Sequence, residues 1–292
     1  MTDGAQRPFL FTDPDDDLDE TDRGLVYDLG TLDRRQVLKL LGFGGVTASL
    51  FTIVGCGPGG GSSASTGATA SVAAPTDGST ASCALIPEET AGPYPADGSN
   101  GPNVLTESGV VRSDITTSFG GSSGTADGVP LSITLTIQDS GTDCAPLAGA
   151  AVYLWQCDRA GNYSLYSQDA ADQNYLRGVQ EADDNGNVTF QSIYPAAYSG
   201  RWPHIHFEVY PSLELATDET NRIATSQIAL PKDASDAVYA TAGYEQSVSN
   251  MERLSLEGDN VFGDDGGAKQ LGTVTGSVAD GYAVTLVVPV GT

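Results

Sequence analysis

Both histidines of this 292-residue chain lie two positions apart, in the stretch YSGRWPHIHFEVY that covers residues 198–210. On a β-strand over residues 202–210, alternate side chains point to opposite faces, so His204, His206 and Glu208 share one face. The apolar residues between them share the other face and are expected to enter the core. Strand geometry places the two imidazoles about 7 Å apart, close enough to bind one metal ion. Packing or surface histidines are the alternative, but the absence of histidine elsewhere in the sequence favours a ligand pair.

Two nitrogen ligands do not complete a metal site, and the metal decides what the other ligands must be. Trivalent iron prefers hard, anionic oxygen donors. The chain has 12 tyrosines, and a bound metal cation removes the proton of a phenol well below its free pKa of about 10. Spacing alone does not choose among these tyrosines. A different ligand set, His204, His206 and Glu208 around zinc or copper in a hydrolytic or redox protein, stays open at this point.

Alternation of apolar and polar residues with a period of two dominates the second half of the chain and predicts β-strands. The clearest runs cover residues 131–138, 151–156, 187–193 and 282–288. The Asn-Gly step at residues 185–186 is a strong hairpin signal. Helical periodicity is weak and predicts a turn or two over residues 234–240. We therefore expect an all-β fold, an antiparallel β-sandwich with short helices and long loops.

The N-terminal residues have the features of an export signal. Arg34 and Arg35 precede a short apolar run, broken by glycines, that ends at Cys56. Paired arginines before such a run indicate a twin-arginine signal, and the small residue before Cys56 resembles a lipoprotein cleavage site. Residues 1–55 are therefore predicted to be a twin-arginine lipoprotein-type signal, with an uncleaved signal anchor as the alternative. The expected location is extracytoplasmic, with a lipid anchor at Cys56 on the outer face of the cytoplasmic membrane.

Composition divides the remainder of the chain into two parts. Residues 56–82 are mostly Gly, Ser, Ala and Thr, which cannot bury enough apolar surface to fold, so a disordered tether is predicted there. Residues 83–292 are long enough for a single domain with a proper core. The whole chain has 13 Lys and Arg against 38 Asp and Glu, a formal net charge of −25. Such a surface repels phosphates, so no nucleic-acid partner is expected.

Three cysteines follow Cys56 and allow at most one internal disulfide, with three possible pairings. An oxidising exterior favours forming it. We predict a disulfide between Cys144 and Cys157, because these two residues flank one apparent strand connection. Cys83 would then be the free cysteine.

Several segments, taken in order, resemble the intradiol ring-cleavage dioxygenases, a family of non-haem ferric enzymes. They are ETAGPY at residues 89–94, VRSDI at 111–115, WQCDRAGNY at 155–163, PAAY at 195–198, RWPHIHF at 201–207 and TSQI at 225–228. The resemblance spans about residues 83–230. Its most specific feature is the order Tyr, Tyr, His-x-His of the family's four iron ligands.

The resemblance implies an Fe(III) cofactor with four protein ligands, Tyr163, Tyr198, His204 and His206. It implies Tyr163 and His206 as equatorial ligands and Tyr198 and His204 as axial ligands. Two tyrosinates and a hydroxide would offset the three positive charges of ferric iron. This charge balance is a physical reason for the ligand set, in addition to the family pattern.

Further roles follow from the same resemblance. Arg201 is expected to stabilise charge that develops on the substrate ring, with a plain surface ion pair as the alternative. Tyr198 is expected to leave the metal and accept a proton. Gln227 is expected to orient the substrate, although its segment matches the family less closely. Tyr94 and Trp155 either line the pocket or belong to the core.

The implied activity is cleavage of catechol-type diols by O₂ between the two hydroxyl-bearing carbons, giving cis,cis-muconate-type products. The expected partners are a small catechol-type substrate and O₂. The alternative is a non-catalytic, metal- or partner-binding β-sandwich lipoprotein at the cell surface. In place of the helical N-terminal segment with which cytoplasmic relatives dimerise, this chain has the predicted signal and tether. The sequence therefore leaves the oligomeric state and the preferred catechol open.

Overall fold

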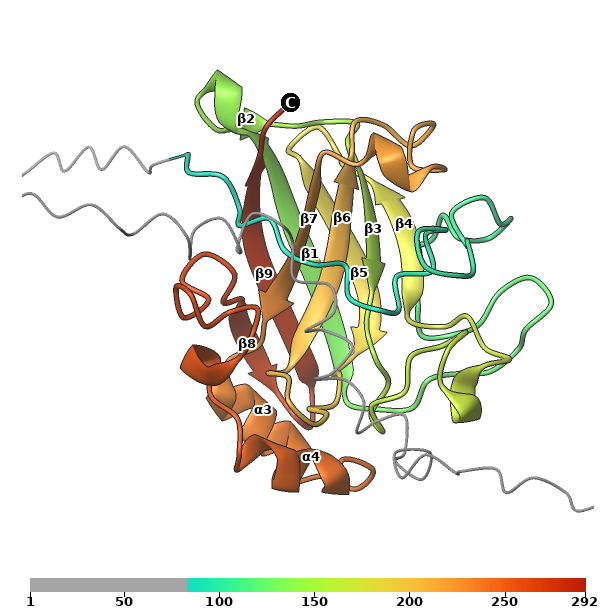
Figure 1. Ribbon diagram of the computed structural model, residues 1–292, viewed down its shortest axis with the longest axis vertical. Coiled ribbons are helices and arrows are strands. Elements are labelled where there is room, and N and C mark those ends of the chain that lie inside the picture. The colour runs from blue at the N-terminus through green and yellow to red at the C-terminus, as the bar shows by residue number, and fades with distance from the viewer. Residues whose placement is uncertain (1–82) are drawn as a thin grey trace, which may run out of the picture. The chain divides into compact units, whose positions relative to one another are not determined.

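The computed structural model describes residues 83–292, drawn in colour in Figure 1. The predicted signal with Arg34 and Arg35, the predicted acylation site at Cys56 and the predicted tether lie outside the described residues. Within residues 83–292, no helix has both the length and the apolar character needed to cross a membrane.

Nine strands and two short α-helices form the described domain. The strands are β1 (Pro130–Asp139), β2 (Ala145–Pro146), β3 (Ala151–Trp155), β4 (Arg177–Glu181), β5 (Asn187–Ile193), β6 (His204–Tyr210), β7 (Ala224–Ala229), β8 (Thr273–Ser277) and β9 (Gly281–Val290). The helices are α3 (Lys232–Tyr239) and α4 (Glu245–Met251). Four 3₁₀ turns lie between them: η2 (Ser140–Thr142), η3 (Gln168–Ala170), η4 (Glu219–Asn221) and η5 (Leu256–Gly258).

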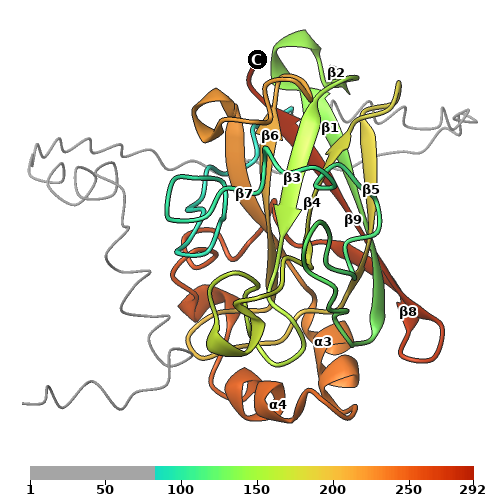
Figure 2. The same cartoon turned by 90° about the vertical axis from the view of Figure 1, so that its right-hand side faces the viewer.

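The strands form two sheets, which Figures 1 and 2 show as layers with both helices at one end. One sheet has the order β4-β3-β6-β7 and is antiparallel throughout. The other has the order β2-β1-β9-β8, with β5 also paired to β1. The expected all-β sandwich is confirmed, with one difference in strand direction: β1 and β9 run parallel over nine residue pairs. A parallel pair joins the end of the chain to the first strand, and local alternation carries no information about such a long-range pairing.

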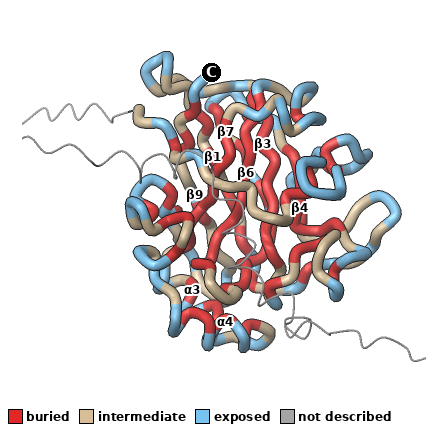
Figure 3. The backbone as a smooth tube through the Cα atoms, in the orientation of Figure 1, coloured by how far each residue is buried: buried red, intermediate tan, exposed pale blue. Residues whose placement is uncertain are grey.

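The main core fills the space between the two sheets. Strand β1 alternates between buried and partly exposed positions along its length, as its sequence predicts for a half-buried strand. Its inward residues Leu131, Ile133 and Leu135 belong to one buried cluster with Ile205 and Phe207 of β6. Figure 3 shows the strands as the most buried part of the molecule, with the exposed turns around them.

The second face of the β4-β3-β6-β7 sheet is covered as well, which the sequence did not predict. All seven residues of β6 are buried. On this face Tyr153 and Trp155 of β3 belong to a second apolar cluster, together with Val104 and Tyr163 from the loops that cross the sheet. His204 and His206 therefore point away from the main core, as expected, but into a second buried layer instead of toward solvent.

The two helices pack against the loop that connects β5 to β6. Helix α3 starts directly after Pro231, whose fixed φ and missing N–H suit the start of a helix, and it covers the region where a turn or two was expected. The hydroxyl of Tyr239 in α3 donates to the carbonyl of Pro195 (3.0 Å). In α4, Ser247 accepts from the backbone N–H of Ala197 (3.1 Å) and Asn250 donates to its carbonyl (2.9 Å). The helices thus fix the segment just before Tyr198.

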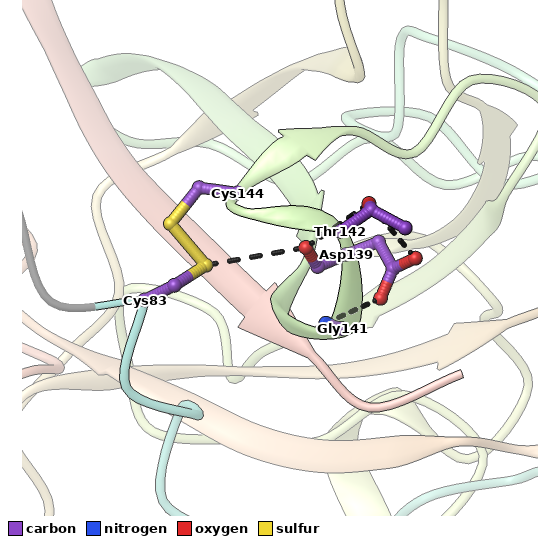
Figure 4. Close-up of a disulfide and its surroundings, with 5 residues drawn as sticks. All are labelled: Cys83, Asp139, Gly141, Thr142 and Cys144. Atoms are coloured by element: carbon purple, nitrogen blue, oxygen red, sulfur yellow. Dashed lines mark hydrogen bonds between the residues drawn. A yellow bond between two sulfur atoms is a disulfide. The ribbon is translucent and has the colours of Figure 1, made fainter.

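The disulfide differs from the predicted one. It joins Cys83 to Cys144, with Cα atoms 5.5 Å apart, and Cys157 is a free, buried thiol. The predicted Cys144–Cys157 pairing is therefore wrong. Cys144 follows the turn after β1, and the start of the described chain passes beside this turn, where Cys83 lies 4.0 Å from the carbonyl oxygen of Asp139 (Figure 4). Cys157 instead lies in the second apolar cluster, near the carbonyl of Ala196.

Candidate active site

Four side chains that are far apart in the sequence meet on the covered face of the β4-β3-β6-β7 sheet. The hydroxyl of Tyr163 lies 3.4 Å from that of Tyr198, 3.4 Å from Nε2 of His204 and 3.2 Å from Nε2 of His206. Nε2 of His204 lies 3.1 Å from both the Tyr198 hydroxyl and Nε2 of His206. The structure thus brings all four predicted metal ligands together, with their donor atoms facing one another.

Strand β6 supplies both imidazoles, and its neighbours hold them in place. Trp155 of β3 is the register partner of His206, and its ring stacks on the imidazole with centroids 4.9 Å apart and planes at 6°. Gln227 of β7 is the register partner of His206 on the other side. A Cβ built on Gly92 would lie 3.4 Å from Cε1 of His206, so the segment 89–94 passes close over the ring. The sequence left open whether Trp155 lines the pocket or belongs to the core. In the structure it does both, because it belongs to the second apolar cluster and its ring stacks on His206.

The tight turn after β3 carries Tyr163. The carboxylate of Asp158 accepts hydrogen bonds from the backbone N–H groups of Ala160 (2.8 Å) and Asn162 (2.9 Å), which closes the turn. Gly161 has φ +92, a conformation that an L-residue adopts only with strain, and its position packs against the Cβ of Tyr198. The Asp and Gly of the WQCDRAGNY segment therefore serve the turn that aims Tyr163 at the histidines.

Arg177 ties the covering loops to this site, and sequence reasoning missed it. Its guanidinium is fully buried and donates to the carbonyls of Tyr94 (3.0 Å), Pro95 (2.9 Å) and Ser164 (2.9 Å). The ring of Tyr94 lies 5.0 Å from that of Tyr163. An isolated arginine carries no distinctive sequence signal here, because most of its hydrogen-bond partners are backbone carbonyls of distant segments.

Burial sets the charge state of the two imidazoles. It lowers the pKa of His204 well below its ordinary value, and the charge of Arg201 lowers it further. It lowers the pKa of His206 in the same way, with the second imidazole and Arg201 adding to the effect. Nδ1 of His204 lies 2.5 Å from the carbonyl oxygen of Trp202, which can only accept, so the ring carries its proton there. Nε2 of His204 therefore presents a lone pair to the cluster, as a metal ligand must.

The donor set and its spacing fit a metal ion with anionic oxygen ligands. Metal–nitrogen bonds are about 2.0–2.1 Å long, so two ligands at a right angle lie about 3 Å apart and two opposite ligands about 4 Å apart. Burial raises the pKa of the Tyr163 phenol well above 10, and a bound cation is what would reverse this and hold the phenolate. Two neutral imidazoles and two phenols are a donor set suited to ferric iron.

The expected division into axial and equatorial ligands does not agree with these distances. The resemblance implies that Tyr198 and His204 are the two axial ligands, which would lie opposite one another. Their donor atoms are 3.1 Å apart, which is the spacing of neighbouring ligands. Tyr163 and His204 are the two groups in contact with all three others, so Tyr198 and His206 lie on the two sides of that pair.

Glu208 does not join the cluster, although it lies on the same face of β6. Its carboxylate accepts from the Tyr210 hydroxyl (2.7 Å), and burial raises its pKa to about 8. Among residues 83–292, no group of three or more His, Cys, Asp or Glu side chains could hold a metal ion. The geometry therefore gives no support to a zinc or copper site made of His204, His206 and Glu208.

Arg201 lies beside the cluster in a buried network. Its Nη2 donates to Oε1 of Gln227 (2.7 Å), and its Nε donates to the carboxylate of Asp259 (3.1 Å). Nε2 of Gln227 donates to the carbonyl of Thr90 (2.9 Å), which links the network to the segment that covers His206. The side chains of Arg201 and Asp259 are 1% and 0% exposed, so the alternative of a surface ion pair is wrong. Asp259 was missed because it is 58 residues from Arg201.

Comparison with known proteins identifies the family. The profile of the family described as "Dioxygenase" matches residues 101–229, a range that contains Tyr163, Tyr198, His204, His206 and Arg201. A solved intradiol ring-cleavage dioxygenase from Tetranychus urticae is 29% identical, with a TM-score of 0.57, and the alignment covers 72% of this chain and 95% of that chain. The chain belongs to the intradiol ring-cleavage dioxygenase family.

Curated members of this family match over a shorter region. The catechol 1,2-dioxygenase of Candida albicans is 39% identical over 57 residues, which is 20% of this chain and 19% of that protein. The chlorocatechol 1,2-dioxygenase of Rhodococcus opacus is 37% identical over 57 residues, 20% of this chain and 22% of that protein. The chain therefore aligns with about a fifth of the length of the curated relatives it matches.

Proposed function

We propose that the chain is a non-haem Fe(III) dioxygenase that cleaves catechol-type diols with O₂ between the two hydroxyl-bearing carbons, giving cis,cis-muconate-type products. The observation that carries this proposal is the meeting of Tyr163, Tyr198, His204 and His206, in which five of the six pairs of donor atoms lie 3.1–3.4 Å apart. These four residues would hold the iron. When bound, Fe(III) would make a chelated catecholate reactive toward O₂.

The two phenols have different surroundings, which supports different roles. Tyr163 is 2% exposed, whereas Tyr198 is partly exposed and borders a cavity of about 100 Å³ lined in part by Ser199, Gln246 and Arg253 of the α4 side. A buried phenol suits a permanent ligand. A phenolate beside a cavity can turn away when a substrate arrives, and it can then take a substrate hydroxyl proton and become a neutral phenol.

Arg201 and Gln227 would act on the substrate. A guanidinium that is already oriented needs no reorganisation when negative charge develops on the ring, so its stabilising effect in a buried site is large. Arg201 donates to the side-chain amide of Gln227, which is the register partner of His206 on β7. Gln227 would thereby set the orientation of Arg201 and of the substrate together.

A non-catalytic lipoprotein is the alternative function, and no feature of the site favours it. A binding module that had lost turnover would not need a buried arginine with two dedicated partners. All of the residues that the family resemblance assigns to the site are present and converge.

We also propose that the chain is exported by the twin-arginine route and anchored through an acylated Cys56. The Cys83–Cys144 disulfide supports this, since disulfides persist in oxidising compartments. Cell fractionation of the chain and of its Cys56→Ser variant tests the anchor. The substituted chain is expected in the soluble extracytoplasmic fraction, and retention of both chains in the membrane would contradict acylation at Cys56.

A visible spectrum of the purified, iron-loaded chain tests the enzymatic proposal, before and after addition of catechol without oxygen. Tyrosinate-to-iron charge transfer is expected to colour the protein red, and catechol is expected to move the band to longer wavelength. Admission of O₂ should then produce muconate with one O₂ consumed per catechol. Tyr163→Phe should weaken and shift the band, because only Tyr198 would remain as a phenolate ligand, while Tyr282→Phe, a tyrosine of β9 outside the site, should leave it unchanged. A colourless iron-loaded protein that catechol leaves unchanged would rule the proposal out.

A further inference from the structure

The carboxylate of Asp259 accepts four buried hydrogen bonds. Its Oδ2 accepts from Nε of Arg201 (3.1 Å) and from the backbone N–H of Trp202 (2.7 Å). Its Oδ1 accepts from the backbone N–H groups of Val261 (2.8 Å) and Phe262 (3.1 Å). The side chain is 0% exposed. We infer that Asp259 is a positioning residue that fixes the guanidinium of Arg201 toward the metal and substrate site.

The geometry constrains the guanidinium in more than one direction. Asp259 holds Nε, and Gln227 holds Nη2 on another edge of the same planar group. Two hydrogen bonds to different edges of a rigid plane fix both its position and its rotation. The ring of Phe262, which follows Asp259 in the chain, lies with its centroid 6.0 Å from the guanidinium carbon. The loop after η5 thus provides both the carboxylate of Asp259 and the aromatic ring of Phe262 that lie against Arg201.

Only a carboxylate satisfies this position. Arg201 is 1% exposed, and a buried cation without a paired anion is strongly unfavourable. An ionised carboxylate offers acceptor sites on both oxygens and can take all four N–H donors, whereas an amide has one acceptor oxygen. Asparagine at residue 259 would therefore leave one pair of donors facing an NH₂ group, either Arg201 and Trp202 or Val261 and Phe262.

This inference rests on the proposed function, because it assigns Asp259 to the reaction through Arg201. Asp259 would touch neither substrate nor metal. It lies outside the region 101–229 that the family profile matches, so the contact joins the loop after η5 to the segment RWPHIHF at residues 201–207. Its effect on turnover should consequently disappear when Arg201 itself is removed.

The test is a double-substitution cycle on the full, iron-loaded chain with catechol as substrate. Arg201→Gln is expected to lower kcat by roughly 100-fold, in the range found when one charge-stabilising donor is removed. Asp259→Asn should lower kcat by roughly 10–100-fold with the charge-transfer band retained, and it should add less than twofold in the Arg201→Gln background. The control is Asp236→Asn, an exposed carboxylate paired with Lys232, which should match the unsubstituted chain.

The cycle stays decisive if Asp259→Asn alone does not fold. In Arg201→Gln the carboxylate of Asp259 keeps its three backbone N–H donors, and the double variant has no charge at either position, so these two chains can still be compared. Equal kcat values in these two chains support the inference. A further drop of tenfold or more in the double variant would overturn it, because Asp259 would then act on something other than Arg201.

A readout that does not depend on turnover separates this inference from the proposed function. In the full chain loaded with diamagnetic Ga(III), the Arg201 Nε–H proton should exchange slowly with solvent. Asp259→Glu, which keeps the charge but moves the carboxylate, should speed this exchange by at least tenfold, and Asp236→Asn should not. Unchanged exchange would overturn the inference even if the enzyme is active. A complete lack of turnover in the unsubstituted chain, with slow exchange intact, would count against the proposed function alone.

Discussion

Trp155 lies flat on His206, with ring centroids 4.9 Å apart and an angle of 6° between the planes. The two histidines of the site are therefore oriented in different ways. His204 is fixed by a hydrogen bond between its Nδ1 and the carbonyl of Trp202 (2.5 Å). Within residues 83–292, Nδ1 of His206 is buried without a hydrogen-bond partner, so packing against Trp155 is what sets the angle of its ring.

Replacement of Trp155 should therefore weaken metal binding as well as lower stability, and the loss of metal binding should exceed that of an equally buried substitution elsewhere. Trp155→Leu is expected to reduce the free energy of unfolding by about 3 kcal/mol, because a fully buried aromatic side chain is lost. It should also weaken iron binding by at least tenfold, measured by competition with a chelator. Phe207→Leu is the matched control: it lies next to His206 on β6, is as buried as Trp155 and faces the main core. Equal iron affinities in the two variants would contradict an orienting role for Trp155.

Local pattern predicted much of what surrounds this pair. The alternation at residues 187–193 and 202–210 predicted β5 and β6, and it correctly separated His204 and His206 from Ile205 and Phe207. The same alternation could not show that the histidine face is covered, because the covering side chains come from loops without periodicity. The choice of Tyr163 and Tyr198 among 12 tyrosines came from the family resemblance and not from spacing.

The elements that sequence reasoning missed all depend on contacts between distant segments. The parallel pairing of β1 with β9 and the contact between Arg201 and Asp259 each join positions that no local signal relates. The disulfide was predicted wrongly for the same reason. Cys144 and Cys157 are close in the sequence, but β3 separates them, whereas Cys83 reaches Cys144 from the start of the described chain.

The Cys83–Cys144 disulfide should be a large contributor to stability. It closes a loop with a sequence separation of 61 residues, for which the loss of chain entropy in the unfolded state corresponds to about 4 kcal/mol. The Cys83→Ser/Cys144→Ser variant is expected to lose about 2–4 kcal/mol of unfolding free energy in urea titrations. Cys157→Ala should keep the disulfide and its resistance to reduction. Loss of the disulfide peptide from a digest of Cys157→Ala would instead point to a pairing that includes Cys157.

Glu89 should make stability depend on pH near neutrality. Burial and the charge of Asp264 raise its pKa from 4.5 to about 7, while a hydrogen bond from Gln270 and the charge of Arg201 oppose the rise. Since the folded pKa is above the unfolded one, the folded chain holds more protons between pH 4.5 and 7, and its stability falls as the pH rises through that window. Above pH 7 the penalty for ionising Glu89 is fully present.

Glu89→Gln should remove this dependence. Because Glu89 is partly exposed and screened by solvent, the unfolding free energy of the unsubstituted chain should fall relative to that of Glu89→Gln by on the order of 1 kcal/mol between pH 4.5 and pH 8. Urea titrations at the two pH values measure the difference. Glu257→Gln, at an exposed position in η5, is the control. Parallel pH profiles for Glu89→Gln and the unsubstituted chain would contradict the raised pKa.

Asn250 should affect the metal site from a distance, because α4 holds the peptide before Tyr198. Its Nδ2 donates to the carbonyl of Ala197 (2.9 Å), and Asn250 is 6% exposed. Asn250→Ala leaves that buried carbonyl without its donor, which is expected to cost about 1–3 kcal/mol of unfolding free energy. The freed segment should let Tyr198 move, so the charge-transfer band of the iron-loaded protein is expected to shift or weaken.

Ser249→Ala provides the matched control for this prediction, since Ser249 is on the same helix and borders the same cavity but is exposed, and its hydroxyl donates to the carbonyl of Gln246 (3.0 Å). The spectrum of Ser249→Ala should equal that of the unsubstituted chain. Asn250→Ala should also bind catechol with a changed affinity in the absence of oxygen. The reason is that Tyr198, the proposed ligand that leaves the metal when the substrate binds, is then held less firmly. If Asn250→Ala loses stability but keeps both the band and the catechol affinity, the hydrogen bond to Ala197 supports the fold without placing Tyr198.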